Sequence, residues 1–245
     1  MTDVKTLYLD LMKRCLTNFI YRDIGYLSST FNPEVREAGQ DWPSVAHTMI
    51  GLKRLDNLQF CVEDILARGV PGDLIETGVW RGGATIFMRA ILKAYSVTDR
   101  CVWVADSFAG LPPPNPERYP KDAGDLCHTY EQLAVSVDEV KSNFSRYELL
   151  DEQVCFLKGW FRDTLPSAPI EQLAVIRLDG DMYESTMDAL NNLYPKLSVG
   201  GYLIVDDYGT IPACAQAVTD YRHAHGITDE IHVIDWTGVY WKRSS

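Results

Sequence analysis

The sequence predicts an α/β protein with a seven-stranded, doubly wound and mostly parallel sheet that ends in an antiparallel hairpin. From residue 71 onward, short apolar runs bounded by turn residues alternate with longer segments of helical spacing, as in parallel α/β sheets. The last two runs, 231–234 and 239–241, are separated only by Asp235-Trp-Thr-Gly238, which predicts a hairpin. The 245 residues, 46% hydrophobic and 23% charged, suffice for a single domain over 1–245 with a full core.

The residues before the first strand, 1–70, are predicted to form a helical region in front of the core. Val4, Leu7 and Leu11 recur at helical spacing and belong to an amphipathic pattern. The turn at Pro71-Gly72-Asp73 then closes the region. Its predicted elements are a helix over 3–23, a polar irregular stretch over 24–44 and a second helix over 45–68.

The core, 71–245, is predicted to carry the sheet. Its first five strands are separated by helices or long connections, so we expect them to run parallel and to be buried on both faces. The strands are placed at 74–76, 101–105, 154–157, 173–178, 202–205, 231–234 and 239–241.

One connection, 108–150, is too long for this compact alternation. Leu111-Pro-Pro-Pro-Asn-Pro116 breaks regular structure, and helical spacing resumes at 138–144. A connection of this length in a compact domain is typical of a lid or a binding loop. We therefore predict a substrate lid.

Composition and charge argue against several classes of function. A net charge of −11 disfavours a nucleic acid partner, which requires a basic face. The six cysteines are scattered without a C-x-x-C pair, so free thiols are expected. The sequence has no signal-peptide core and no apolar run of about 18 residues, so we expect no membrane partner and a cytoplasmic setting. His223 and His225 lie two apart in a predicted helix, on different faces, which argues against a metal site there.

Four carboxylates follow two of the apolar strands. Asp179 and Asp181 come after the fourth strand, and Asp206 and Asp207 come after the fifth. The carboxyl ends of parallel strands form the crevice where α/β sheets bind ligands. Clustered acids repel one another unless a cation or a shared proton relieves them. The pattern predicts a divalent metal site or an acid/base site; a cap for the following helix is the simpler alternative for Asp181 or Asp207 taken alone.

A glycine-rich turn after the first strand predicts a ligand site beside these acids. Gly78, Gly82 and Gly83 would let the backbone approach a ligand, although the spacing is not G-x-G-x-x-G and a plain strand–helix turn is the alternative. Glu76 before the first glycine suits an ammonium group better than a pyrophosphate. Asp106 ends the second strand, where an acid commonly accepts hydrogen bonds from ribose hydroxyls. S-adenosylmethionine fits both expectations.

Several motifs, in this order along nearly the whole chain, resemble those of the TylF-type macrocin O-methyltransferase family, whose members methylate sugar hydroxyls on macrolide and aminocoumarin antibiotics. The motifs are Asp41-Trp-Pro-Ser-Val-Ala-His-Thr-Met-Ile50, Arg54-Leu-Asp-Asn57, Glu76-Thr-Gly-Val-Trp-Arg-Gly-Gly83, Trp103-Val-Ala-Asp-Ser-Phe108, Lys158-Gly-Trp-Phe-Arg-Asp-Thr-Leu165, Leu178-Asp-Gly-Asp-Met-Tyr-Glu-Ser-Thr186 and Val205-Asp-Asp-Tyr208.

The resemblance implies a Rossmann-like class I methyltransferase fold and an enzyme that depends on S-adenosylmethionine and Mg²⁺. Its acceptor would be a sugar hydroxyl of a glycosylated natural product, with macrolide sugars as the first choice, and the chain would form a homo-oligomer. Asp179, Asp206 and Asp207 would bind the metal. Asp181 would be the catalytic base, with Asp179 as the alternative, and a general base near the metal suits a hydroxyl of high pKa.

The resemblance and the motif positions also imply contacts around the two substrates. Trp160 and Phe161 would form the adenine wall, unless they only pack the core, and Arg81 would reach the methionine end or pair with a surface acid. His128, unless solvated, and Tyr208 would contact the acceptor. The full set for the cofactor is Thr48, Met49, Glu76, Thr77, Gly78, Arg81, Gly82, Asp106, Ser107, Trp160, Phe161 and Asp163.

Two other functions fit the same predicted sheet. A nicotinamide-dependent sugar oxidoreductase or epimerase is disfavoured because G-x-G-x-x-G is missing and neither Tyr208 nor Tyr221 has a lysine at the Tyr-x-x-x-Lys offset. A non-catalytic module that senses a nucleoside or a metal would need no base beside the metal.

Overall fold

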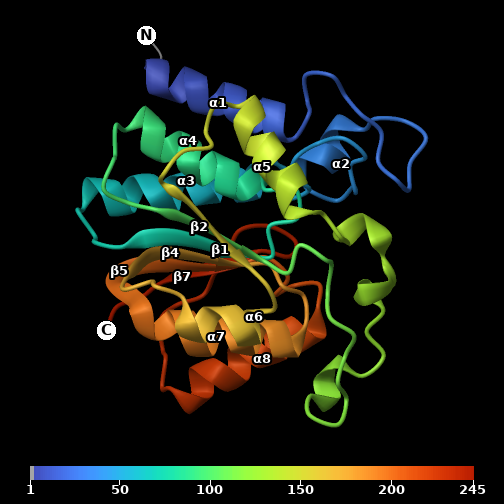
Figure 1. Cartoon of the computed structure of the whole chain (residues 1–245), viewed down its shortest axis with the longest axis vertical. Coiled ribbons are helices and arrows are strands. Elements are labelled where there is room, and N and C mark those ends of the chain that lie inside the picture. Colours follow the sequence, from blue (N-terminus) through green and yellow to red (C-terminus); the bar gives the residue numbers. More distant parts are fainter. Residues whose placement is uncertain (1–2) are drawn as a thin grey trace.

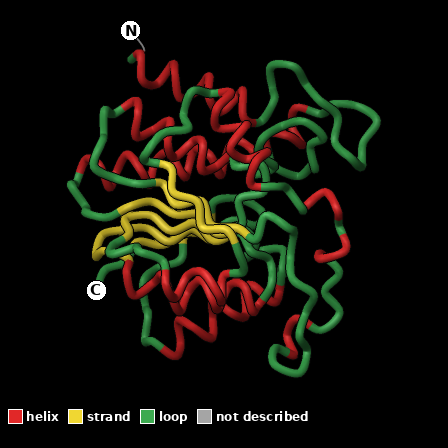
Figure 2. The backbone as a smooth tube through the Cα atoms, in the orientation of Figure 1, coloured by secondary structure: helices red, strands yellow, loops and turns green. Residues whose placement is uncertain are grey.

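A seven-stranded sheet runs through the middle of the protein, between two layers of helices (Figures 1 and 2). The computed structural model describes residues 3–245, so the first two residues of the predicted 1–245 domain lie outside the described residues. The strand order is β3-β2-β1-β4-β5-β7-β6, in which β1 to β5 are parallel and β7 is antiparallel to both neighbours. The predicted doubly wound sheet with a terminal hairpin is confirmed. The strands are β1 (Asp73–Thr77), β2 (Val102–Asp106), β3 (Val154–Lys158), β4 (Leu173–Leu178), β5 (Leu197–Val205), β6 (His232–Val233) and β7 (Val239–Lys242).

Helices cover both faces of the sheet because its central strands are apolar on both sides. All six residues of β4 are buried, and Val175 and Ile176 belong to the hydrophobic clusters on opposite faces. Each such buried side chain contributes about 1.5–3 kcal/mol. One layer, above the sheet in Figure 1, contains α1 (Val4–Leu16), α2 (Pro33–Glu37), α3 (Gly51–Ala67), α4 (Gly83–Ala94) and α5 (Val137–Arg146). The other contains α6 (Phe161–Thr164), α7 (Tyr183–Leu193) and α8 (Pro212–Ala224).

The register of the three central strands brings their carboxyl ends to one level. Thr77 of β1 is paired with Leu178 of β4, and Leu178 is paired with Val205 of β5. The residues that follow these strands therefore emerge side by side at the same edge of the sheet. This edge carries the glycine turn after β1 and the acids after β4 and β5.

The N-terminal elements are shorter than predicted. The helix predicted over 3–23 ends at Leu16, and Asn18 adopts a left-handed φ of 53°. The helix predicted over 45–68 begins only at Gly51, since the backbone N–H groups of His47 and Thr48 both donate to the carbonyl of Leu16. These tertiary hydrogen bonds replace the first predicted turns of the helix.

Two strands also differ from their predicted bounds. β5 starts at Leu197, five residues before the predicted start at 202. The prediction missed these residues because Gly200 and Gly201 interrupt the apolar pattern of the strand. The predicted strand 231–234 shortens to His232–Val233 at the edge of the sheet.

The excursion 108–150 is irregular apart from three short 3₁₀ turns and α5. The turns are η1 (Pro120–Asp122), η2 (Cys127–Thr129) and η3 (Glu131–Leu133); two others, η4 (Leu165–Ser167) and η5 (Tyr194–Lys196), lie elsewhere in the chain. In Figure 1 the excursion runs in green to yellow-green along one side of the molecule, between the two helical layers. Its role as a lid stays a prediction.

Among residues 3–245, no helix combines the length and the apolar character needed to cross a bilayer. All six cysteines lie within these residues and are free thiols.

Candidate functional site

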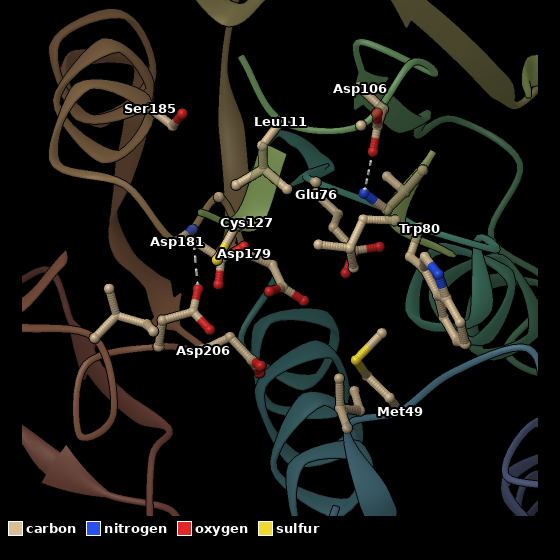
Figure 3. Close-up of a pocket in the computed structure, with 18 of the residues that line it drawn as sticks. Met49, Glu76, Trp80, Asp106, Leu111, Cys127, Asp179, Asp181, Ser185 and Asp206 are labelled. Atoms are coloured by element: carbon tan, nitrogen blue, oxygen red, sulfur yellow. Dashed lines mark hydrogen bonds between the residues drawn. The ribbon is translucent and has the colours of Figure 1, made fainter. Parts of the chain in front are cut away.

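A cavity of about 460 Å³ opens at the carboxyl edge of the central strands. Its floor is formed by residues that follow β1, β4 and β5, and one wall is formed by the excursion. In Figure 3, Glu76, Asp179 and Asp206 point toward the same space, with Met49 across from them.

Three of the four predicted acids form a compact cluster in this cavity. One carboxylate oxygen each of Asp179, Asp206 and Asp207 can be chosen so that all three lie within 4.8 Å of one another. The backbone N–H of Asp181 donates to Asp207 at 3.2 Å (Figure 3). Asp181 has a left-handed φ of 57°, a conformation uncommon for residues with a side chain. The turn after β4 is therefore held in an unusual shape beside the acid cluster.

Two buried arginines hold the acids from beneath. Arg177 of β4 is 1% exposed, donates to Asp179 at 2.7 Å, and also donates to Glu76 and Asp206. Arg54 of α3 also donates to Asp206. The sequence interpretation missed both arginines, although Arg177 stands inside an otherwise apolar strand, where a buried charge requires partners of opposite charge.

The arginines do not neutralise the whole cluster. Burial, together with the charges of neighbouring carboxylates, raises the pKa of Asp179 to about 6 and that of Asp181 to about 7. Burial likewise raises the pKa of Asp207 well above its usual range. A bound cation would relieve the repulsion between these carboxylates, and a set of hard carboxylate oxygens suits Mg²⁺. The residues present therefore fit a divalent metal ion.

Glu76 provides an unpaired hydrogen-bond acceptor in the cavity. It is 2% exposed; its Oε1 accepts from Arg177, whereas its buried Oε2 accepts no hydrogen bond from residues 3–245. Burial raises the pKa of Glu76 to about 8, against the lowering effect of Arg177. A buried acceptor without a donor is costly, and a ligand that donates a hydrogen bond removes the cost.

Asp106 lines the cavity but already binds the backbone. Its carboxylate accepts from the N–H groups of Val79 at 2.8 Å and Phe108 at 2.7 Å. It thereby fixes the glycine turn after β1 against the loop after β2 (Figure 3). The packing of the turn also requires glycine at position 78, because a Cβ there would lie 1.7 Å from the carbonyl oxygen of Asp179.

The structure brings most of the predicted residues to the cavity. Besides the four acids, the predicted residues that line it are Thr48, Met49, Glu76, Gly78, Asp106, Ser107, Trp160 and Phe161.

Three predicted cofactor residues near the glycine turn do not line the cavity. Thr77 is enclosed within β1 and is 1% exposed. Arg81 instead donates to the carbonyl of Ala46 at 2.9 Å and to the Tyr26 hydroxyl at 3.1 Å, so it fastens the N-terminal region to the turn. Gly82, with a φ of 85°, forms the N-cap of α4, where a Cβ would lie 2.8 Å from Val140.

Three further predicted residues also lie away from the cavity wall. The Asp163 side chain is 64% exposed on α6. His128 buries its Nδ1 without a partner among the described residues. Tyr208 packs against the hydrophobic cluster on the α7 and α8 side of the sheet.

Aromatic side chains from several segments complete the wall, and the sequence interpretation assigned most of them no role. Trp42 packs edge-on against Tyr130 of the excursion, with ring centroids 5.6 Å apart. Trp80 donates from its ring nitrogen to the carbonyl of Gln132 at 2.8 Å. Trp42 lines the cavity together with Trp80, Tyr130 and Trp236.

Known proteins resemble this chain over almost its whole length. Residues 25–243 match the family model of the macrocin-O-methyltransferases (TylF). The chain is 58% identical over 247 residues to the mycinamicin III 3''-O-methyltransferase of Micromonospora griseorubida, covering 98% of this chain and 97% of that protein. It is also 58% identical over 248 residues to the 8-demethyl-8-(2,3-dimethoxy-alpha-L-rhamnosyl)-tetracenomycin-C 4'-O-methyltransferase of Streptomyces olivaceus, covering 99% and 95%.

A solved structure agrees with these matches. The O-methyltransferase NovP superimposes with a TM-score of 0.96 at 57% identity, covering 98% of this chain and 100% of that chain. The resemblance inferred from the motifs is confirmed. The chain belongs to the macrocin-O-methyltransferase (TylF) family and is an O-methyltransferase.

Proposed function

We propose that this protein transfers a methyl group from S-adenosylmethionine to a sugar hydroxyl of a glycosylated natural product, with Mg²⁺ bound at the acids. One observation supports this most strongly: the carboxylates of Asp179, Asp206 and Asp207 cluster within 4.8 Å, in the same cavity as the unpaired oxygen of Glu76. A metal site and an acceptor for an ammonium group are thus adjacent. The relatives named above carry names of sugar-modifying and macrolide-modifying O-methyltransferases.

The cofactor would lie along the turn after β1. Glu76 Oε2 would accept a hydrogen bond from the ammonium group, and Asp106 would face the ribose with the lone pairs that Val79 and Phe108 leave free. Trp160 and Phe161 would cover the adenine. These contacts would orient the methyl group toward the acids, and orientation is a large part of catalysis in a two-substrate reaction.

A bound Mg²⁺ would supply Lewis acidity that lowers the pKa of an acceptor hydroxyl. Asp181 then removes the proton at its carboxylate. Within residues 3–245 this carboxylate accepts no hydrogen bond, whereas Asp179 is bound by Arg177 at 2.7 Å. The free carboxylate is the better proton acceptor, so the geometry favours Asp181 over Asp179 as the base.

The acceptor site would occupy the part of the cavity enclosed by Trp42, Tyr130 and Trp236. Ligand cavities lined by aromatic groups with a few polar groups suit amphipathic molecules such as sugars on an apolar aglycone. We propose a macrolide sugar as the first acceptor to test. The chain is equally identical, at 58%, to the mycinamicin III enzyme and to the rhamnosyl-tetracenomycin-C enzyme, so glycosides other than macrolides are the next candidates.

Calorimetry and an acceptor panel test the proposal. S-adenosylhomocysteine should bind and NAD should not, which separates a methyltransferase from a nicotinamide-dependent oxidoreductase. Macrolide glycosides, other glycosides and their aglycones are then incubated with S-adenosylmethionine and Mg²⁺. Binding of NAD, or no methylation of any glycoside by protein that binds S-adenosylhomocysteine, would contradict the proposal.

We also propose that the chain forms a homo-oligomer through its N-terminal region. Val4, Leu7 and Leu11 lie on one face of α1 and are 77%, 57% and 53% exposed. An apolar helical face of this kind commonly marks a protein interface. Light scattering after size exclusion tests this: a single monomeric mass for the native protein would contradict it, and Leu7→Glu should lower the mass of an oligomer.

A further inference from the structure

A buried carboxylate of the excursion caps the helix that follows the candidate base. Asp122 is 2% exposed and lies at the end of η1. Its two oxygens accept from the backbone N–H groups of Tyr183 at 2.7 Å and Glu184 at 3.0 Å. These are the first two residues of the eleven-residue helix α7, whose own N-cap residue, Met182, provides no side-chain hydrogen bond. The cap therefore comes from 61 residues away in the sequence.

Asp122 lies at the N-terminus of α7, where an anion stabilises a helix most. The first N–H groups of a helix have no partner within the helix, and they carry the positive end of its dipole. Asp122 satisfies two of these groups at once and is enclosed while doing so. If the excursion moved away, both N–H groups would lose their acceptor together.

Asp122 and Asp207 hold the same short turn from opposite ends. Asp207 accepts from the N–H of Asp181, and Asp122 accepts from the N–H of Tyr183, two residues later. Between them, Met182 is completely buried. Asp181 keeps a left-handed φ of 57°, which persists only where the surroundings enforce it. The direction of its side chain therefore depends on both fastenings.

The segment that carries Asp122 continues directly into the cavity wall. Cys127 and Tyr130, which follow it in the excursion, line the cavity. A second fastening lies on the cofactor side, where Trp80 donates to the carbonyl of Gln132. The excursion is thus attached at the start of α7 and at the glycine turn, on opposite sides of the cavity.

We propose that Asp122 is a positioning residue that couples closure of the excursion over the cavity to the orientation of the Asp181 carboxylate. The inference rests on the proposed role of Asp181 as the base. With Asp122 in place, the excursion covers the acceptor and the turn holds its left-handed conformation. Without Asp122, the start of α7 frays, the turn relaxes and the base loses its alignment with the acceptor hydroxyl.

The first test is independent of any reaction. Asp122→Ala is compared with the native protein and with Glu117→Ala, which removes an exposed acid from the same excursion. Amide hydrogen exchange should become faster at Tyr183, at Glu184 and along the excursion in Asp122→Ala, and should stay native in Glu117→Ala. Unchanged exchange at Tyr183 and Glu184 would overturn the proposal, whether or not the protein proves to be a sugar methyltransferase.

The second test separates positioning from a loss of structure. In Asp122→Ala, kcat should fall by about ten- to a hundredfold, because misalignment by about 1 Å has an effect of this size. The Kd of S-adenosylhomocysteine should stay within about twofold of native, since Asp122, unlike Glu76 and Asp106, does not line the cavity. Asp122→Asn, whose single carbonyl oxygen replaces one of the two acceptors, should recover part of kcat.

Two results for Asp122→Ala and Asp122→Asn would overturn the proposed coupling. A native kcat in Asp122→Ala with faster exchange at the start of α7 would overturn the coupling. A parallel loss of kcat and of S-adenosylhomocysteine affinity in both Asp122 variants would show a structural role only. If Asp122→Ala does not fold, Asp122→Asn decides: kcat reduced with unchanged Kd supports the proposal, and native kcat refutes it.

Discussion

The backbone N–H of Asp181 donates to the carboxylate of Asp207 at 3.2 Å, which joins the turn after β4 to the acids after β5. The register of β4 with β5 makes this contact possible, since Leu178 and Val205 are paired at the ends of their strands. The candidate base and a candidate metal ligand therefore belong to one rigid unit. A substitution at Asp181 or at Asp207 should therefore alter the position of the other residue.

Asp181→Asn should reduce kcat by at least about a hundredfold, because general acid–base catalysis contributes about 10²- to 10⁴-fold. Asparagine tolerates the left-handed φ of 57° that this position requires, so the fold should be preserved. The affinity for S-adenosylhomocysteine, measured by calorimetry, should stay within about twofold. Asp163→Asn, at a side chain that is 64% exposed, is the matched control and should retain native kcat. More than one tenth of native kcat in Asp181→Asn would argue against its role as the base.

Removal of divalent metal should abolish turnover, and Mg²⁺ should restore it. Because metal binds only to the folded cluster, Mg²⁺ at about a hundred times its Kd should add about 2.7 kcal/mol to the free energy of unfolding. Asp207→Asn should weaken this stabilisation while the cofactor still binds. Thermal unfolding with and without Mg²⁺ measures the effect, and turnover that survives exhaustive chelation would contradict the metal site.

Arg177→Met should destabilise the protein by about 3–5 kcal/mol, because it leaves buried carboxylates without their partner. Arg177 is 1% exposed and contacts Glu76, Asp179 and Asp206. Arg68→Met is the surface control: its side chain is 36% exposed in a pair with Asp64, and such pairs contribute about 0–1 kcal/mol. Urea unfolding compares the two variants. Equal, small decreases in the free energy of unfolding of the two variants would mean that Arg177 does not stabilise the buried acids.

His47 should make stability depend on pH between about 4 and 6.5. Burial, together with the positive charges of Arg146 and Arg81, lowers the pKa of His47 to about 4, and its Nδ1 lies 2.8 Å from the Tyr147 hydroxyl. As the pH falls, the unfolded chain binds a proton at His47 before the folded protein does. The contribution of neutral His47 to the free energy of unfolding is therefore full above about pH 6.5 and is lost as the pH falls toward 4.

Between pH 7 and pH 5 the loss should be about 1 kcal/mol, allowing for the partial exposure of the ring. His47→Gln should remove this dependence, and the double difference between the two proteins cancels the titration of the acid cluster. Chemical denaturation at both pH values makes the comparison. Identical pH dependence in native protein and variant would refute a buried neutral His47.

Much of the fold could be predicted because its information is local. The apolar runs and the turn residues that bound them mark the five parallel strands, and acids placed at strand ends must meet at one edge of a parallel sheet. This reasoning predicted that Asp179, Asp181, Asp206 and Asp207 meet at that edge, whereas the choice of Asp179, Asp206 and Asp207 as one group came from the family resemblance.

The misplaced residues are those whose position depends on distant backbone. Arg81 looked like a cofactor contact because it sits in the glycine turn, yet its guanidinium binds the carbonyl of Ala46, 35 residues earlier. The helical pattern over 45–68 likewise hid the hydrogen bonds from His47 and Thr48 to Leu16, which delay the helix. Arg54 and Arg177 were missed because ion pairs across 152 and 29 residues leave no periodic signal.

The central claim is that the methyl group goes to a sugar hydroxyl of a glycosylated acceptor. The most direct measurement is fragmentation mass spectrometry of the product formed from S-adenosylmethionine carrying a labelled methyl group, with Mg²⁺ and a glycosylated macrolide or related glycoside present. We predict that the label appears only on the sugar fragment, and that the matching aglycone is not methylated. A label on the aglycone, or equal methylation of acceptors without a sugar, would contradict the claim.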